Sequence, residues 1–224
     1  MITDFGLLRL LQLVSPGLPI GMYSYSQGFE GAVEDGLIKN DEDAEEWFSG
    51  MLINGLQHID LPILVRFYYA WQRRDFDAVR RWSRTLTAYR ETAELRSEDR
   101  QTGQALARLL TDLNIDEARE WRRRPDTTLA ALFALAAVQW QIPLRDTLTG
   151  YAWSWLENQV LCAVKLVPLG QVAGQRLLGN LANLLPDRVD RVLLISDEEI
   201  GGSAYGLALA SSRHEMQYSR LFRS

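Results

Sequence analysis

The sequence is poor in the residues that form covalent cross-links and metal sites. It contains one cysteine, Cys162, and two histidines, His58 and His214, in 224 residues. A single cysteine cannot form a disulfide within the chain and is typical of a reducing compartment. A dedicated zinc site would need carboxylates in addition to these side chains. We therefore expect no tightly bound metal or other cofactor.

Long apolar runs and an excess of positive charge are also missing. The apolar stretch TTLAALFALAAVQW is shorter than the roughly 20 residues needed to cross a bilayer. The opening run MITDFGLLRLLQLV carries Asp4 and Arg9, unlike a secretory signal peptide. The formal net charge is −5, whereas nucleic-acid binding needs a basic face. We expect a cytoplasmic protein that binds neither membranes nor nucleic acid.

Common catalytic motifs are absent as well. Ser26 lacks the first glycine of a G-x-S-x-G nucleophile elbow, and the chain has no GxxxxGK[ST] phosphate loop. One enzymatic alternative stays open, namely a small all-α enzyme that uses carboxylates in an internal pocket. Glu157, Glu94 and Asp43 are examples of such carboxylates, and the reaction requires two carboxyl groups whose pKa values are pushed apart in one cleft.

Helical periodicity dominates what is present. Apolar residues at helical spacing predict a first helix that buries one face, with Asp4 as its cap; they are Leu7, Leu10, Leu11 and Val14. Further helices are expected at 23–35, from 41, from Asp60 to 74, at 77–87, at 90–110, from 125, and between the prolines at 143, 168 and 186. Hydrophobic residues make up 47% and charged residues 24%, as in ordinary globular proteins. We predict an all-α fold: a single domain of about ten packed helices.

Two expected helices carry charges in unusual places. The segment RETAELRSEDRQTG (90–103) is mostly charged, which indicates a solvated face or, alternatively, a docking face for a charged partner. In the helix near 145–165, Glu157 and Lys165 share a ridge with Leu161. They lie at the edge of the apolar stripe, at a surface between proteins, or along a polar passage.

The last residues differ from the rest of the chain. The glycine-rich IGGSAYG (200–206) is expected to be a mobile hinge between a helical body (1–199) and a C-terminal tail (200–224). The tail has more arginine than acid and is expected to place His214, Tyr218, Leu221 and Phe222 on one helical face. Arginine and aromatic residues are frequent in interface hot spots. The tail is equally expected to dock on a partner or on the body.

Four segments of the sequence are distinctive when taken together: SPGLPIGMYSYSQGFE, RETAELRSEDRQTG, YAWSWLENQVLCAVKLVPLGQVAGQRLL and SSRHEMQYSRLFRS. In this order they resemble the UreF family of urease accessory proteins. The resemblance runs in order from Leu7 to Ser224, with a weak match at 114–128. Met22 departs from the family, which usually has a small residue there. The resemblance implies an all-helical, dimeric and non-enzymatic maturation factor.

The resemblance also implies partners. Proteins of this family bind a second accessory protein, UreD (UreH in some systems), and recruit the GTPase UreG to deliver nickel to apo-urease. Nickel would then be cargo of the complex and not a cofactor of this chain. A narrower hypothesis is that an arginine of this chain reaches into the nucleotide site of UreG and changes GTP hydrolysis.

The resemblance points to residues that contact partners. Tyr23 matches a P-x-G-x-Y segment, Arg220 a Y-S-R-L segment, and Lys165 a V-K-x-V-P segment, while Glu30 and Asp60 match acidic positions. We expect the tail to fold back so that Arg220 meets the Tyr23 loop. The partner-binding set also includes four further tail residues: Arg213, His214, Tyr218 and Phe222.

Overall fold

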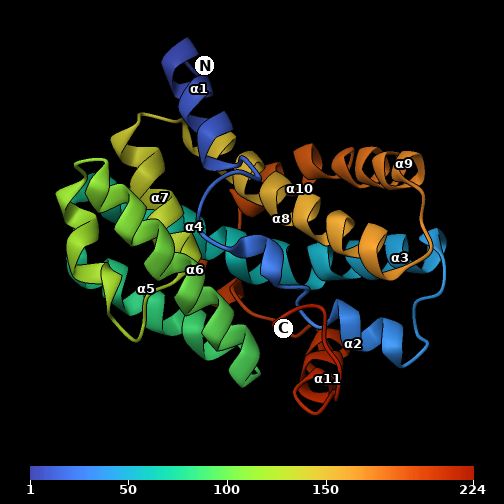
Figure 1. Ribbon diagram of the computed structural model, residues 1–224. Helices are drawn as coiled ribbons and strands as arrows, with labels where there is room; N and C mark the ends of the chain where they lie inside the picture. The colour runs from blue at the N-terminus through green and yellow to red at the C-terminus, as the bar shows by residue number, and fades with distance from the viewer.

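The computed structural model describes residues 1–224 and consists of helices, turns and loops with no strand, which confirms the all-α prediction. Figure 1 shows the helices packed into one domain. The α-helices are α1 (Asp4–Leu13), α2 (Phe29–Glu34), α3 (Asp41–Met51), α4 (Leu61–Arg73), α5 (Phe76–Tyr89), α6 (Ala93–Asp112), α7 (Leu129–Gln139), α8 (Leu144–Leu166), α9 (Gln171–Ala182), α10 (Leu185–Val192) and α11 (Tyr205–His214). Short 3-10 turns are η1 (Met22–Ser24), η3 (Asp116–Arg122) and η4 (Asp197–Glu199).

A continuous helical rod forms the centre of the fold. It runs through α3, the π-helix η2 (Leu52–Asp60) and α4 without a break. The separate helix expected from Asp60 to 74 is therefore wrong: Asp60 has helical backbone angles, its side chain caps nothing, and α4 continues the rod. Pro62 lies inside this rod, directly after the π-helix, and has no N–H to donate to the preceding turn. A π-helix of this length is rare, and π-turns often occur at functional sites.

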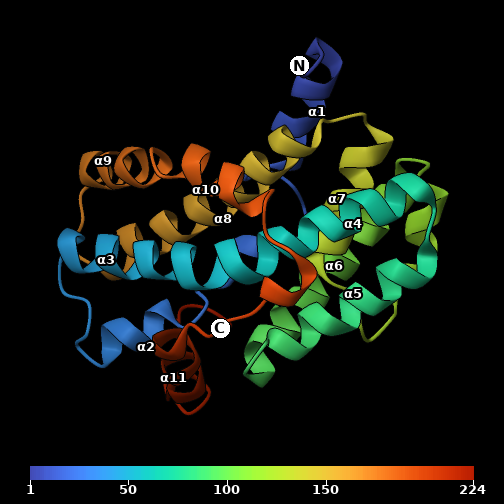
Figure 2. The ribbon, with the colours of Figure 1, turned by 180° about the vertical axis from the view of Figure 1, so that it is seen from behind.

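The remaining helices cover this rod on two sides. In Figures 1 and 2, α5, α6 and α7 gather around α4, whereas α8, α9 and α10 cover α3 and η2. Helix α7 is fully buried from Ala130 to Ala137 and joins the two halves of the core. A helix that is apolar all round belongs in the interior of a domain.

The first helix departs from the prediction. Thr3 and not Asp4 is its N-cap, because the Thr3 hydroxyl accepts from Gly6 N at 3.0 Å. The expected inward face is largely exposed: Leu7 is 44% exposed and Leu11 55%. Helix α1 instead projects from the domain at the N-terminus, as Figure 1 shows. Helical spacing predicted the helix correctly but could not say which face would be covered.

Other helix boundaries differ from the expected ones by a few residues. Helix α2 begins at Phe29 and not near Tyr23, because Gly28 adopts a left-handed conformation that interrupts the chain after η1. Helix α7 starts at Leu129, capped by the Thr128 hydroxyl. Helices α5, α6, α8 and α9 lie close to their expected ranges. None of the helices combines the length and the apolar character needed to span a membrane.

Candidate functional site

The C-terminal tail, residues 200–224, folds back onto the body. After Gly201 and Gly202, both at positive φ, helix α11 lies against α2. The approach is close at Gly31, where a Cβ atom would lie 2.7 Å from the carbonyl oxygen of Ala210. Hydroxyls of Thr92 and Ser211, both buried, join the tail to the start of α6 at 2.8 Å. The tail therefore docks on its own chain.

Helix α11 ends at His214, and the residues that follow are not helical. The expectation of one amphipathic face was therefore wrong. His214 and Phe222 are buried, whereas Tyr218 and Leu221 are exposed. The reason is that Glu30 holds this stretch as a loop, with its carboxylate accepting from Leu221 N at 2.7 Å and from Phe222 N at 2.8 Å.

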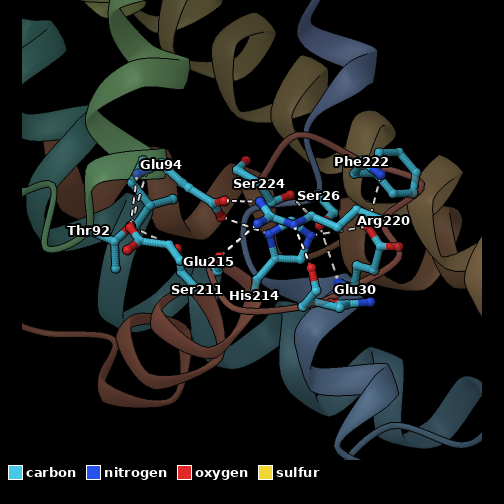
Figure 3. Close-up of polar contacts among 12 residues, drawn as sticks. Ser26, Glu30, Thr92, Glu94, Ser211, His214, Glu215, Arg220, Phe222 and Ser224 are labelled. Atoms are coloured by element: carbon cyan, nitrogen blue, oxygen red, sulfur yellow. Dashed lines mark hydrogen bonds and ion pairs between the residues drawn. The ribbon is translucent and has the colours of Figure 1, made fainter.

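Four charged or titratable side chains form what we call the tail clamp: Glu30, Glu94, His214 and Arg220 (Figure 3). The His214 ring lies 3.2 Å from Glu30 through Nε2 and 2.7 Å from Glu94 through Nδ1. Arg220 donates to the other Glu94 oxygen at 2.6 Å. The clamp thus ties α2 and α6 of the body to both halves of the tail.

The end of the tail meets the loop before α2. Ser224 is buried and accepts from Ser26 N at 2.7 Å, while Arg223 N donates to Ser24 O at 2.8 Å. We expected Arg220 to meet this loop, but Arg220 points to Glu94 and contacts the carbonyls of Glu215 and Gln217 instead. The tail does reach the loop, through its last two residues.

Glu98 lies below this contact and is almost fully buried. Its carboxylate accepts from Gln27 Nε2 at 2.7 Å and from the Ser224 hydroxyl at 2.8 Å. Burial raises the pKa of Glu98 to about 7, against the opposing effect of the hydrogen bonds from Gln27 and Ser224. Glu98 therefore changes charge near neutral pH at the point where tail and loop meet.

Two more predicted residues lie beside the tail. The Lys165 ammonium is 5.3 Å from the centre of the Phe222 ring, a cation–π contact between α8 and the tail. Tyr23 donates to Glu157 at 3.5 Å, and burial together with the Glu157 charge raises the pKa of Tyr23 to about 12. Arg213 pairs with Asp35 at 2.6 Å at the outer edge of the tail.

Asp60 belongs to a separate buried group. Arg90, at the end of α5, donates to both Asp60 carboxylate oxygens and to Asp99 at 2.9 Å. Desolvation raises the pKa of Asp99, while the charge of Arg90 opposes this shift. The charged segment 90–103 suggests an i,i+4 pair of Arg90 with Glu94 on one helix, but Arg90 precedes α6 and turns inward, so this pair does not form.

A cavity lies beside this group, between η2, α6, α8 and the chain after Gly202. Its polar lining includes Asp60, Glu98, Asp99 and Arg90. The carboxylates of the enzymatic alternative, Glu157, Glu94 and Asp43, do not line it, so the pocket expected for that alternative is not formed by them. No group of three or more His, Cys, Asp or Glu side chains is arranged to hold a metal ion.

The structure therefore gathers most of the predicted residues around the tail. Glu30, Lys165, His214, Arg220 and Phe222 hold it, while Arg213, Tyr23, Asp60 and Tyr218 lie beside or outside the clamp.

Sequence reasoning missed Glu94, Glu98 and Ser26 as partners of the tail. The available signal is the charge density of residues 90–103, which indicates either a solvated face or a docking face for a charged partner. Glu98 and Asp99 are in fact buried. The charged partner of that helix is the tail of the same chain.

Fold and clamp together define an all-helical protein whose C-terminal tail is held to its body by a buried charge cluster. A UreF family model matches residues 38–182. The urease accessory protein UreF of Alkalilimnicola ehrlichii is 53% identical over 216 residues, which is 96% of this chain and 95% of the relative. UreF of Pseudomonas putida strain W619 is 50% identical over all of both chains, and UreF of Hahella chejuensis is 44% identical over 97% of this chain and 98% of the relative. The chain belongs to the UreF family of urease accessory proteins.

Proposed function

We propose that this chain is a non-catalytic scaffold for urease maturation. Together with UreD it recruits the GTPase UreG, and the assembly inserts nickel into apo-urease in the cytoplasm. Nickel is cargo of the assembly, and the chain holds no cofactor of its own. The proposal rests on family membership and on the clamped tail.

The observation that carries the proposal is the contrast between the two sides of the tail. Its inner side is fixed by buried contacts of Glu30 and His214. Its outer side exposes large side chains, with Tyr218 at 105%, Met216 at 87% and Leu221 at 63% of their full accessible surface. Exposed apolar and aromatic side chains gathered on one surface are suited to protein recognition, because they bury apolar area on binding.

Co-purification with cognate UreD and UreG tests the scaffold. We expect the full chain to form a complex, and we expect a chain truncated after Ala210 to lose it. Arg220→Ala is the finer probe, since it removes one clamp contact and leaves the body intact; it should weaken complex formation. Arg108→Ala, at an exposed position on α6, is the matched control. Normal assembly by both the truncated chain and Arg220→Ala would refute the role of the tail.

A homodimer is part of the proposal, and helix α1 is its candidate contact. Phe5, Leu7, Leu8 and Leu11 are each more than 40% exposed and lie on a helix that projects from the domain. Exposed apolar patches of this kind indicate interaction sites. Leu8→Glu should yield a monomer by light scattering, whereas Asp4→Ala should leave the dimer unchanged.

An effect on GTP hydrolysis is the second candidate function. The exposed Arg223, beside the outer surface of the tail, makes it testable. UreG turnover measured with UreD and the wild-type chain, and again with Arg223→Ala, decides the matter. Equal GTP turnover by UreG with and without this chain would refute an effect on hydrolysis, and the scaffold would then be the chain's one proposed role.

A further inference from the structure

A shallow groove lies on the side of the domain away from the tail clamp. It runs between α4 and α5 and is closed on one side by the turn that follows α10. Figure 2 shows α4 and α5 at one side of the domain and α11 at the other. The side chains important here are Arg73 and Tyr69 from α4, Arg81 and Trp82 from α5, and Leu193 from the turn. We call this feature the arginine groove.

The two helices that form the groove are basic in an acidic chain. Residues 61–89 contain six arginines and two aspartates, whereas the whole chain has a formal net charge of −5. Four of the arginines have carboxylate partners, namely Arg66, Arg74, Arg80 and Arg84. The two without such a partner, Arg73 and Arg81, both line the groove.

Each of these two arginines is stacked on an aromatic ring. The Arg73 guanidinium lies 5.7 Å from the centre of the Tyr69 ring, and that of Arg81 lies 5.9 Å from the Trp82 ring. Stacking leaves the N–H edge of a guanidinium free to donate, and it restricts the side chain before a ligand arrives. Tyr69 and Leu193 are both more than 40% exposed, so the floor between the arginines is apolar and accessible.

The acidic residues nearby are already engaged. Asp75 lines the groove, but its carboxylate caps α5 by accepting from Ala78 N at 2.9 Å. Asp197 pairs with Arg66 at 2.7 Å, and Glu199 accepts from Ser196 N at 2.9 Å. The groove therefore presents two guanidinium groups without carboxylate partners, an apolar floor, and one carboxylate, that of Asp75, which is held by the start of α5.

We propose that the arginine groove binds an extended acidic segment of a partner protein, one that alternates carboxylates with aromatic or apolar side chains. The carboxylates would pair with Arg73 and Arg81 through two N–H groups each, which is the geometry that guanidinium favours. The apolar side chains would pack on Tyr69, Trp82 and Leu193. Such a contact is independent of the tail clamp and gives the protein a second docking surface.

Peptide binding to the full chain tests the proposal without any assumption about urease maturation. The probe is a short fluorescein-labelled peptide that alternates glutamate with tyrosine, and the reference probe has lysine in place of glutamate. We expect saturable binding of the acidic probe only. Arg73→Glu combined with Arg81→Glu should weaken it about tenfold or more, since two charged contacts are reversed. The control pair Arg108→Glu and Arg176→Glu has the same charge change at exposed sites on α6 and α9 and should leave binding unchanged.

Several results would overturn the proposal. They are no saturable binding of the acidic probe, equal binding of the lysine probe, and equal weakening by the control pair. Displacement of the probe by a single-stranded oligonucleotide of higher affinity would assign the groove to nucleic acid. If the wild-type chain is a dimer and Arg73→Glu combined with Arg81→Glu is a monomer, the groove would be assigned to contact with a second copy of this chain. Because all of the substituted side chains are exposed, thermal unfolding should confirm that every variant is folded.

Discussion

The imidazole of His214 lies between the carboxylates of Glu30 and Glu94, with each ring nitrogen facing one of them. Both nitrogens donate only when each carries a proton. Arg220 adds a positive charge beside Glu94. The ring is fully buried, so an unbalanced charge in this place is costly.

His214→Ala should therefore release the tail. The substitution leaves Glu30 and Glu94 without their shared partner, and we expect the free energy of unfolding to fall by about 2–4 kcal/mol. Limited proteolysis should cut the variant within residues 205–224 faster than wild type. Tyr218→Ala is the control, because that side chain is fully exposed and should change neither readout. Unchanged protection in His214→Ala would show that the clamp does not hold the tail.

Because Glu98 is buried, we expect the free energy of unfolding to depend on pH. Burial raises its pKa in the native state from 4.5 to about 7, so the native state binds a proton more tightly than the unfolded state between these values. The stabilisation is fully present below about 4.5 and is lost as the pH rises through about 7, amounting to about 3 kcal/mol.

Glu98→Gln should remove this part of the pH dependence. Urea unfolding of both proteins near pH 6 and pH 8 gives the comparison, and wild type should lose more stability over this interval than the variant. Glu91→Gln, at an exposed position on the surface, serves as the control. The same slope in wild type and Glu98→Gln would contradict the assignment.

Substitution of Arg90 should lower the free energy of unfolding more than substitution of either of its carboxylate partners. Arg90→Leu leaves Asp60 and Asp99 buried without a positive charge, and such losses cost about 3–5 kcal/mol. Asp60→Asn keeps the Arg90–Asp99 pair and should cost less. The free energies of unfolding of the two variants, measured in urea, provide the test. A smaller loss for Arg90→Leu than for Asp60→Asn would be contrary to this account.

Gly31→Ala tests the close packing of α11 against α2 separately from the charged contacts of the tail clamp. Its Cβ atom would lie 2.7 Å from the Ala210 carbonyl oxygen, so α11 must move away from α2 while every clamp residue is kept. We expect faster exchange of the α11 amide hydrogens with the rest of the domain protected. Gly179→Ala is the matched control in α9, where nothing lies within 4 Å of the added atom. That substitution should be neutral or stabilise the helix by up to about 1 kcal/mol.

Much of the fold could be predicted because helix spacing and caps are local signals. The prolines at 143 and 168 and the glycine at 36 correctly separated helices. The continuous rod through Asp60 was not predicted, because an aspartate followed by a proline two residues later is also the pattern of a new helix start, and local sequence does not distinguish the two. The exposed leucines of α1 show a second limit, since periodicity defines an apolar face but not what covers it.

The site was predictable only in part, because local sequence signals do not say which distant residues come into contact. The resemblance to a family marked Glu30 and Arg220, which do hold the tail. The partner of Arg220 is Glu94, 126 residues away in the sequence, and no local pattern connects two such positions. Glu98 looks like an ordinary surface acid because charged helices are usually solvated. Its burial depends on the loop before α2 and the tail closing over it.

The clamp also gives the tail an electrostatic role. While docked, the tail places His214 between Glu30 and Glu94, pairs Arg220 with Glu94, and covers Glu98 with Ser224. Once the tail leaves, these three carboxyl groups from α2 and α6 are uncovered together and exposed to water. The body would then carry a new anionic surface that attracts cations and basic partners. Release of the tail therefore removes its apolar outer surface and uncovers an anionic surface on the body. A truncated chain would lose the first binding surface and gain the second.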